Sequence, residues 1–203
     1  MICYRFASHS TPLRVLPSSD AARFNGGDDA GPTQYLALHP VGPLAELMRR
    51  NDLREVEQVR SVRTRTWALE VDVSDLPELT FDNAEGDFGI AAADVVGDDH
   101  RACRALASRL RGDVPGVIAP SAALPGTRNV ILFGPRVAAP YLTDPVSTLD
   151  VPASITAQDG RALLSLLDVV RFEGDSHAAL EAWERGTSFE FVEPDWALTR
   201  EQP

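Results

Sequence analysis

The segment TQYLALHPVGPLAELMRR at residues 33–50 decides the fold class, because it places a strand directly before a helix. TQYLAL, residues 33–38, is a short and largely apolar run that predicts a strand. PLAELMRR, residues 43–50, predicts a short helix, because Pro43 suits a first-turn position and the apolar residues recur at helical spacing. A strand that leads into a helix in this way is typical of a mixed α/β or α+β protein.

Strands and helices continue to alternate on both sides of this segment, with Pro/Gly loops between them. The best-defined helix is the amphipathic run at 98–111, where Cys103, Leu106 and Leu110 share one face. Other helices are predicted at 158–170 and 176–185, and strands at 2–6, within 63–73, and at 114–119, 129–133 and 189–192. We therefore expect an α/β (mixed α+β) chain that forms a single domain over residues 1–203, with the recognisable motifs in residues 3–133 and residues 134–203 packed on them.

Composition limits the classes of function. The chain has 203 residues, 44% of them hydrophobic, which is enough to bury one sizeable core. Its formal net charge of -11 does not suit a protein that binds a nucleic-acid backbone directly. Every basic residue other than histidine is arginine, which excludes Schiff-base and P-loop chemistry because both need a lysine. The abundance of Ala, Asp, Val and Pro is typical of a GC-rich genome.

Cysteine and histidine spacing predicts neither a disulfide framework nor a metal site. Cys3 and Cys103 lie far apart without a CxxC motif, and we expect both to be reduced, buried thiols. The four histidines are scattered without metal-ligand spacing, so no metal is expected. No segment approaches the roughly 18 apolar residues of a membrane span, and the amino terminus lacks a signal-peptide pattern. These features predict a cytoplasmic protein without a membrane contact.

A long polar loop at residues 8–32 carries the first candidate site residues. Loops of this length within a compact protein are often functional. Arg23 lies in it within ARFNGG, beside Asn25. A guanidinium flanked by glycines is suited to holding a phosphate, because it donates two charge-assisted hydrogen bonds while the backbone can approach the anion. Alone, the same residues also fit a turn with a surface arginine.

Three further candidates have two interpretations each. Glu46 lies off the apolar stripe of its helix, so it is either a solvated carboxylate or a carboxylate that faces a pocket near the helix amino terminus. Tyr35, within its strand, is either a core aromatic or a site residue. Ser121 follows a buried strand without a GxSxG turn, so a hydrogen-bonding role is favoured over a nucleophilic one. Periodicity alone leaves these alternatives open.

Taken in order along the chain, these motifs resemble the RES family, which is named for its arginine, glutamate and serine. The series begins with YRF at residues 4–6 and continues with RFNGG, QYLAL and LAEL. It ends with GVIAPSA followed by RNVILF, so the resemblance covers about residues 3–133. The agreement in order, spacing and flanking apolar character is more specific than any single residue.

The resemblance implies a fold similar to that of ADP-ribosyltransferase toxins, with short sheets around an NAD cleft and peripheral helices. It implies that Arg23, Glu46 and Tyr35 are catalytic. Arg23 and Arg5 would grip the pyrophosphate or a ribose, Tyr35 would orient the nicotinamide ribose, and Glu46 would stabilise its positively charged transition state. Asn25 and Ser121 would complete the NAD-binding residues.

The resemblance also implies a bacterial toxin that uses NAD as its substrate and is partnered by a helix-turn-helix, Xre-like antitoxin. Three acceptors for the ADP-ribosyl group are open: inorganic phosphate, water, or a nucleophile on a protein. They define a phosphorylase, a glycohydrolase and an ADP-ribosyltransferase, and family grounds favour the first two. A catalytically silent interaction module is the remaining alternative, favoured by the glycines that follow Arg23 where the family often has them before it.

Overall fold

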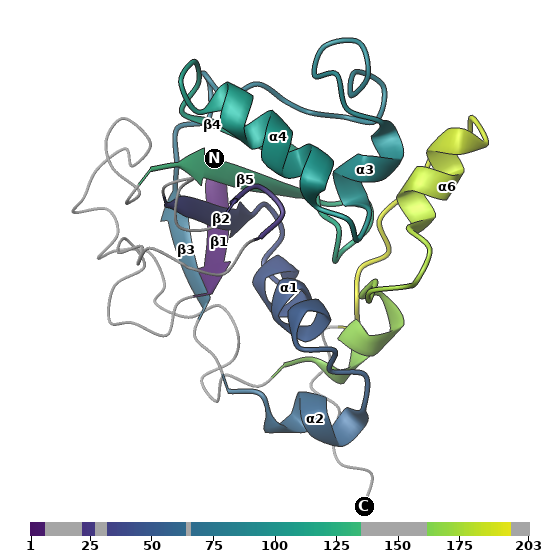
Figure 1. Cartoon of the computed structure of the whole chain (residues 1–203). Helices are drawn as coiled ribbons and strands as arrows, with labels where there is room; N and C mark the ends of the chain where they lie inside the picture. Colours follow the sequence, from purple (N-terminus) through teal and green to yellow (C-terminus); the bar gives the residue numbers. More distant parts are fainter. Residues whose placement is uncertain (7–21, 27–31, 64–65, 135–161, 196–203) are drawn as a thin grey trace, which may run out of the picture.

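The structure is a computed structural model, and it describes residues 1–6, 22–26, 32–63, 66–134 and 162–195 (Figure 1). It is a mixed α+β structure, as the sequence predicted. The strands of the described residues form one five-stranded antiparallel sheet rather than several short sheets. The predicted elements that fall wholly or partly within residues 7–21, 27–31, 64–65, 135–161 and 196–203 lie to that extent outside the described residues.

The sheet has the strand order β3-β1-β2-β5-β4. Its strands are β1 (Ile2–Phe6), β2 (Thr33–Ala37), β3 (Thr66–Glu70), β4 (Gly116–Pro120) and β5 (Arg128–Phe133). In the central pair, β2 and β5, Tyr35 lies opposite Ile131 and Ala37 lies opposite Asn129. Because side chains alternate along a strand, Tyr35, Ala37, Asn129 and Ile131 project from one face of the sheet.

The two faces of the sheet bury different apolar clusters. One face, represented by Val117, Ala119 and Ile131, packs against helices α3 (Ala92–Val96) and α4 (Arg101–Leu110), as Figure 1 shows. The opposite face carries a second cluster, formed largely by the strands' own side chains: Cys3, Leu36, Leu69, Val71, Leu76, Ile118, Val130 and Leu132. Cys3 and Cys103 both lie in buried positions, as the sequence predicted.

Helix α1 (Gly42–Arg50) starts five residues after β2 and lies against the end of that strand. Pro43 occupies its first turn, where a missing N–H costs nothing. Its apolar side, which includes Leu44 and Met48, packs against helix α2 (Val56–Ser61) and residues of the chain's last part such as Leu166. This packing fixes the direction in which the other side of α1 projects.

Gly42→Ala is expected to destabilise the protein, because a Cβ at Gly42 would lie 2.4 Å from the Cβ of Ala37. Overpacking of this kind costs about 1–3 kcal/mol, and the gain in helix propensity offsets up to about 1 kcal/mol of it. Denaturant unfolding should show a lower free energy of unfolding. Gly112→Ala is the matched control, since nothing lies within 4 Å of a Cβ there; equal losses in both variants would contradict the close packing of α1 on β2.

The carboxyl-terminal part differs from its sequence prediction. The strand predicted at 189–192 is wrong: this segment is an irregular stretch that pairs with no strand among the described residues. Its aromatic side chains are used in packing instead, since Phe189 lies against Gly126 and the Phe191 ring packs edge-on against His39. The helix predicted at 158–170 is reduced, within the described residues, to the 3-10 helix η2 (Leu164–Asp168), whereas the helix predicted at 176–185 is present as α6 (Ala178–Glu184).

Helices α2 and α3 were not predicted, because each is only five or six residues long and too short to establish a period. Within the described parts of the chain, none of the helices has the length and apolar character needed to span a bilayer.

Candidate functional site

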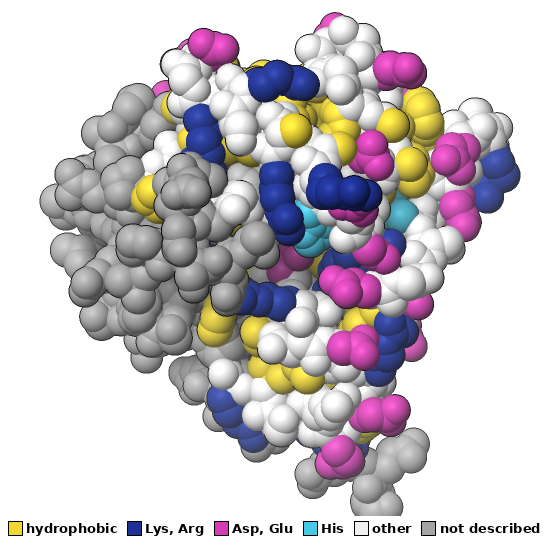
Figure 2. Space-filling model, viewed as in Figure 1, with side chains coloured by type: hydrophobic (Ala, Val, Ile, Leu, Met, Phe, Trp, Pro, Cys, Tyr) yellow, Lys and Arg dark blue, Asp and Glu magenta, His cyan; other side chains and the backbone are white. Residues whose placement is uncertain are grey.

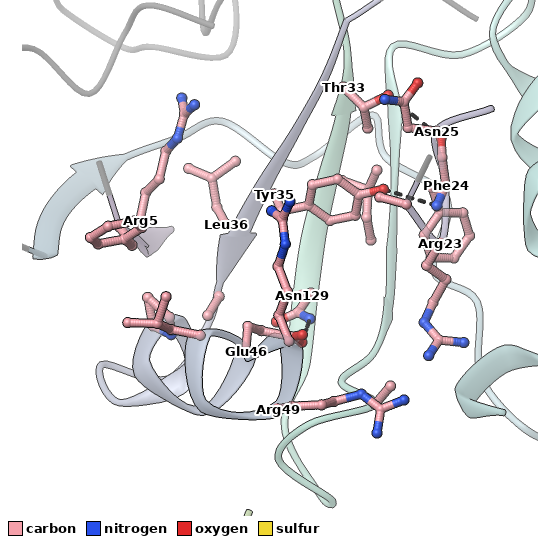
Figure 3. Close-up of a pocket in the computed structure, with 18 of the residues that line it drawn as sticks. Arg5, Arg23, Phe24, Asn25, Thr33, Tyr35, Leu36, Glu46, Arg49 and Asn129 are labelled. Carbon is pink, nitrogen blue, oxygen red and sulfur yellow. Dashed lines mark hydrogen bonds between the residues drawn. The ribbon is translucent and has the colours of Figure 1, made fainter. Parts of the chain in front are cut away.

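A cavity of about 530 Å³ opens between helix α1, the β2–β5 face of the sheet and the turn that contains Arg23. Five of the predicted site residues line it: Arg5, Arg23, Asn25, Tyr35 and Glu46 (Figure 3). In the space-filling view, basic side chains gather around a hollow near the middle of the face shown (Figure 2). The structure thus brings together residues that are separated by more than 40 positions in the sequence.

Glu46 projects from α1 toward the sheet and into this cavity (Figure 3). Its Oε1 accepts hydrogen bonds from Nδ2 of Asn129, at 2.9 Å, and from Oγ of Ser121, at 3.3 Å. No described residue hydrogen-bonds to Oε2 of Glu46. Of the two interpretations left open by the sequence, the structure favours the pocket-facing carboxylate over the solvated one.

Ser121 is buried and does not line the cavity, so it reaches the site only through Glu46. Its Oγ also accepts a hydrogen bond from the Leu124 N–H, which fixes the rotamer. Behind it, Nε2 of His177 donates to the Ser121 carbonyl oxygen at 3.0 Å, while Nδ1 accepts from the Leu180 N–H. Burial lowers the pKa of His177 and favours this neutral tautomer.

Tyr35 holds the Arg23 turn against the sheet. Its hydroxyl accepts a hydrogen bond from the Phe24 N–H at 2.9 Å, and its ring lines the cavity. Burial raises the pKa of Tyr35 to about 12, so the phenol is neutral. The turn itself is closed by paired backbone hydrogen bonds between Ala22 and Asn25. Its carbonyl groups accept from the α4 arginine Arg104 and from Arg111 just beyond that helix.

Arg23 is a cation in a desolvated position. Its Nη1 donates to a backbone carbonyl oxygen, that of Val95, at 3.2 Å, and the Cys103 side chain is a second hydrogen-bond partner. Among the described residues, no carboxylate forms an ion pair with Arg23. Burial lowers the pKa of Arg23, and the nearby Cys103 and Glu46 oppose that shift. Because burying a cation without a counter-ion is unfavourable, this geometry favours an anionic ligand beside Arg23.

Arg5 and Asn25 border the cavity differently. The Arg5 guanidinium turns away from Glu46 and donates to Oε1 of Gln34, on the opposite face of the sheet (Figure 3). Burial lowers the pKa of Arg5 to about 10, so it remains a cation. Asn25 is only 4% exposed, and its Oδ1 has no hydrogen-bond partner among the described residues. Of these two predicted residues, Asn25 therefore has the free hydrogen-bonding capacity at the cavity.

The comparison with known proteins gives the family. Residues 2–153 match the RES domain. The chain belongs to the RES domain family. A solved structure described as that of the M. tuberculosis MbcT–MbcA toxin-antitoxin complex is also similar to it, with 26% identity, a TM-score of 0.47, and coverage of 64% of this chain and 72% of that one. No curated protein matches the sequence significantly.

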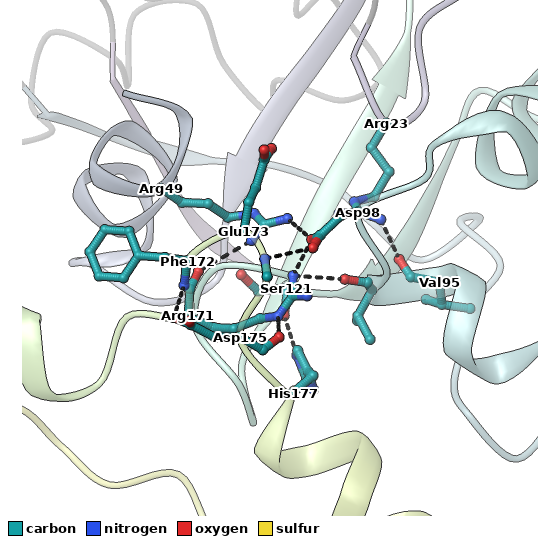
Figure 4. Close-up of polar contacts among 12 residues, drawn as sticks. Arg23, Arg49, Val95, Asp98, Ser121, Arg171, Phe172, Glu173, Asp175 and His177 are labelled. Atoms are coloured by element: carbon teal, nitrogen blue, oxygen red, sulfur yellow. Dashed lines mark hydrogen bonds and ion pairs between the residues drawn. The ribbon is translucent and has the colours of Figure 1, made fainter. Parts of the chain in front are cut away.

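A charge cluster, which the sequence did not reveal, reaches the cavity of this RES-domain protein through Arg49 (Figure 4). Asp98 lies between two arginines that are each less than 10% exposed: its Oδ1 is 2.6 Å from Nη2 of Arg49 and 2.8 Å from Nη1 of Arg171. The Gly174 N–H donates to its other oxygen at 2.8 Å. Partial burial would raise the pKa of Asp98, but these hydrogen bonds outweigh it and hold the pKa well below its usual range.

Three further residues at the RES-domain cavity were missed in the sequence: Arg49, His100 and Asn129. Arg49 follows Glu46 by three positions on a helix, and that spacing could have placed it on the same side. Asn129 stands within RNVILF, where alternation puts it on the same face as Tyr35. His100 carries no such signal. Burial lowers its pKa to about 4, helped by Arg23 and Arg104, so its ring is neutral near pH 7.

Proposed function

We propose that this RES-domain protein is a toxin that degrades NAD by cleaving the nicotinamide–ribose bond. One observation carries the proposal: a carboxylate, Glu46, is held by two neutral donors in the same cavity as the desolvated cation Arg23, with which no carboxylate of the described residues forms an ion pair. Membership of the RES family supports the same reading. The cavity volume also lies within the range of about 300–1,000 Å³ that is usual for small-molecule sites.

The two charges suit different parts of a dinucleotide. The Arg23 guanidinium would bind the pyrophosphate through charge-assisted hydrogen bonds. The Glu46 carboxylate would accept a hydrogen bond from a ribose hydroxyl and stabilise the positive charge that develops on the ribose as the bond to nicotinamide breaks. Tyr35 would pack beside that ribose. Because nicotinamide leaves as a neutral molecule, the reaction needs positioning and charge stabilisation rather than a strong general acid.

The acceptor of the ADP-ribosyl group defines the enzyme class. Inorganic phosphate would make the protein an NAD phosphorylase, and water would make it a glycohydrolase. Both small acceptors suit a cavity that would also hold the dinucleotide, so we place them before an ADP-ribosyltransferase that modifies a protein. An enzyme that consumes a shared cofactor must be restrained in the cell, and we propose that an Xre-like, helix-turn-helix antitoxin does so.

Purified protein, freed of any bound partner, is expected to release nicotinamide from NAD. The assay is run with and without inorganic phosphate: faster release with phosphate, accompanied by a phosphorylated ADP-ribose product, identifies the phosphorylase, whereas equal rates and free ADP-ribose identify the glycohydrolase. Expression without an antitoxin should slow growth and lower cellular NAD. Soluble, folded protein that releases no nicotinamide and leaves cellular NAD unchanged would support the silent interaction module instead.

A further inference from the structure

Asn129 occupies a fixed position on the sheet, directly beneath helix α1. It is paired with Ala37 on β2 and with Ala119 on β4, so both of its neighbours across the sheet have the smallest side chain that a chiral residue can carry. The amide can therefore stand clear of the sheet and reach the Glu46 carboxylate on the helix. Backbone pairing on both sides leaves its Cα little freedom to move.

The two carboxylate oxygens of Glu46 differ in their hydrogen bonds. Nδ2 of Asn129 and Oγ of Ser121 both donate to Oε1, and no described residue donates to Oε2. One oxygen is thus held by the protein, and the other is left to a ligand in the cavity. Both donors are neutral, so they favour the carboxylate without adding a positive charge that would oppose a cationic transition state.

The oxygen of the Asn129 side-chain amide differs from its nitrogen in having no hydrogen-bond partner among the described residues. This oxygen, Oδ1, is buried. A flipped amide would place this oxygen against the carboxylate, where two acceptors repel, so the donor orientation toward Glu46 is the one that chemistry selects. A buried acceptor without a hydrogen-bond partner lowers the stability of the folded protein. An asparagine at this position therefore needs an explanation, and the hydrogen bond from its Nδ2 to Glu46 provides one.

We propose that Asn129 is a positioning residue, which holds the Glu46 side chain so that Oε2 faces the reacting ribose. This role rests on the proposed NAD cleavage, since it assigns Asn129 a task in that same site. Asn129 acts through Glu46. Its loss should therefore affect turnover more than the binding of NAD.

The test compares Asn129→Asp and Asn129→Leu with the wild type in nicotinamide release. Misplacing a reacting group by about 1 Å costs about 100-fold, so kcat should fall about 10- to 100-fold with KM for NAD within about twofold. Asn129→Asp puts a second carboxylate beside Glu46, and like charges raise the apparent pKa of such a pair. The acidic limb of its pH–kcat profile should therefore move to higher pH. Asn51→Asp, an exposed change at the end of the same helix, should alter neither kcat nor the profile.

Wild-type kcat and an unmoved acidic limb in folded Asn129→Asp would overturn the proposal, as would a loss confined to KM. Asn129→Leu decides the matter by the kcat and KM comparison alone if Asn129→Asp does not fold. A wild type that releases no nicotinamide would defeat the proposed function, and the inference would then be judged on the Asn129 side-chain amide signal of ¹⁵N-labelled protein. The chemical shift of that signal should differ between the wild type and Glu46→Gln, because the charged acceptor of its hydrogen bond is lost. The same chemical shift in both proteins would overturn the inference.

Discussion

Glu46→Gln is expected to lower kcat for NAD cleavage by about 100- to 1000-fold, the usual effect of losing one preorganised electrostatic group. Glutamine keeps the size of the side chain, and its carbonyl oxygen can still accept from Asn129 and Ser121. Only the negative charge that faces the developing cation is removed. Because Glu46 packs outside the apolar clusters, the free energy of unfolding should change by no more than about 0.5 kcal/mol.

The measurement is nicotinamide release at saturating NAD, with the melting temperature as the folding control. Glu173→Gln is the matched substitution, because Glu173 is the other acidic residue that lines the cavity but is exposed. It should keep nearly the turnover of the wild type. Equal turnover in the wild type and a stable Glu46→Gln protein would remove Glu46 from the mechanism.

Asp98→Asn is expected to give the largest loss of stability. The substitution leaves Arg49 and Arg171 buried without a shared counter-charge. Removing one partner of a buried ion pair costs about 3–5 kcal/mol, and since the Asp98 side chain is 35% exposed, solvent screening reduces the expected loss to about 2–3 kcal/mol. For a chain of this size the melting temperature should fall by about 5–10 °C.

The pH dependence identifies the cause of that loss. Because the pKa of Asp98 is lowered in the folded protein, its contribution is present above the unfolded value of about 3.9 and fades as the pH falls below it. The wild type and Asp98→Asn should therefore converge in melting temperature in acid. Asp99→Asn is the control, because the neighbouring Asp99–Arg101 pair is exposed and should contribute little. A melting temperature that is equal in Asp98→Asn and the wild type near pH 7 would disprove this account.

The fold was predictable from the sequence wherever a local pattern determines it. The strand predicted at 2–6 is β1, and the helix predicted at 43–50 is α1 with one residue added. Both have periods that can be read within one element. The segment at 189–192 has a strand-like alternation too, but its aromatic residues pack against Gly126 and His39, and no local pattern reports such distant contacts.

The site was predictable only in part, and for a different reason. Arg23, Tyr35 and Glu46 were named through the resemblance to the RES family, because periodicity alone could not separate a pocket-facing Glu46 from a solvated one. The pair between Arg49 and Asp98 joins residues 49 positions apart. Asp98 lies near the end of an acidic stretch, residues 82–99, that contains no recognisable motif. Contacts of this kind are set by tertiary packing.

The Asp98 cluster also shows that the region matching the RES domain depends on residues outside it. Arg171 and Gly174, which bind Asp98 and through it steady Arg49, lie beyond residues 2–153 that match the family. Leu166 and Phe172, which cover the buried side of α1, lie beyond them as well. The region that matches the family is therefore shorter than the set of residues that supports the cavity. Two proteins that are alike throughout the matched region can differ in how firmly Arg49 is held at the cavity, because the residues that hold it through Asp98 lie outside that region.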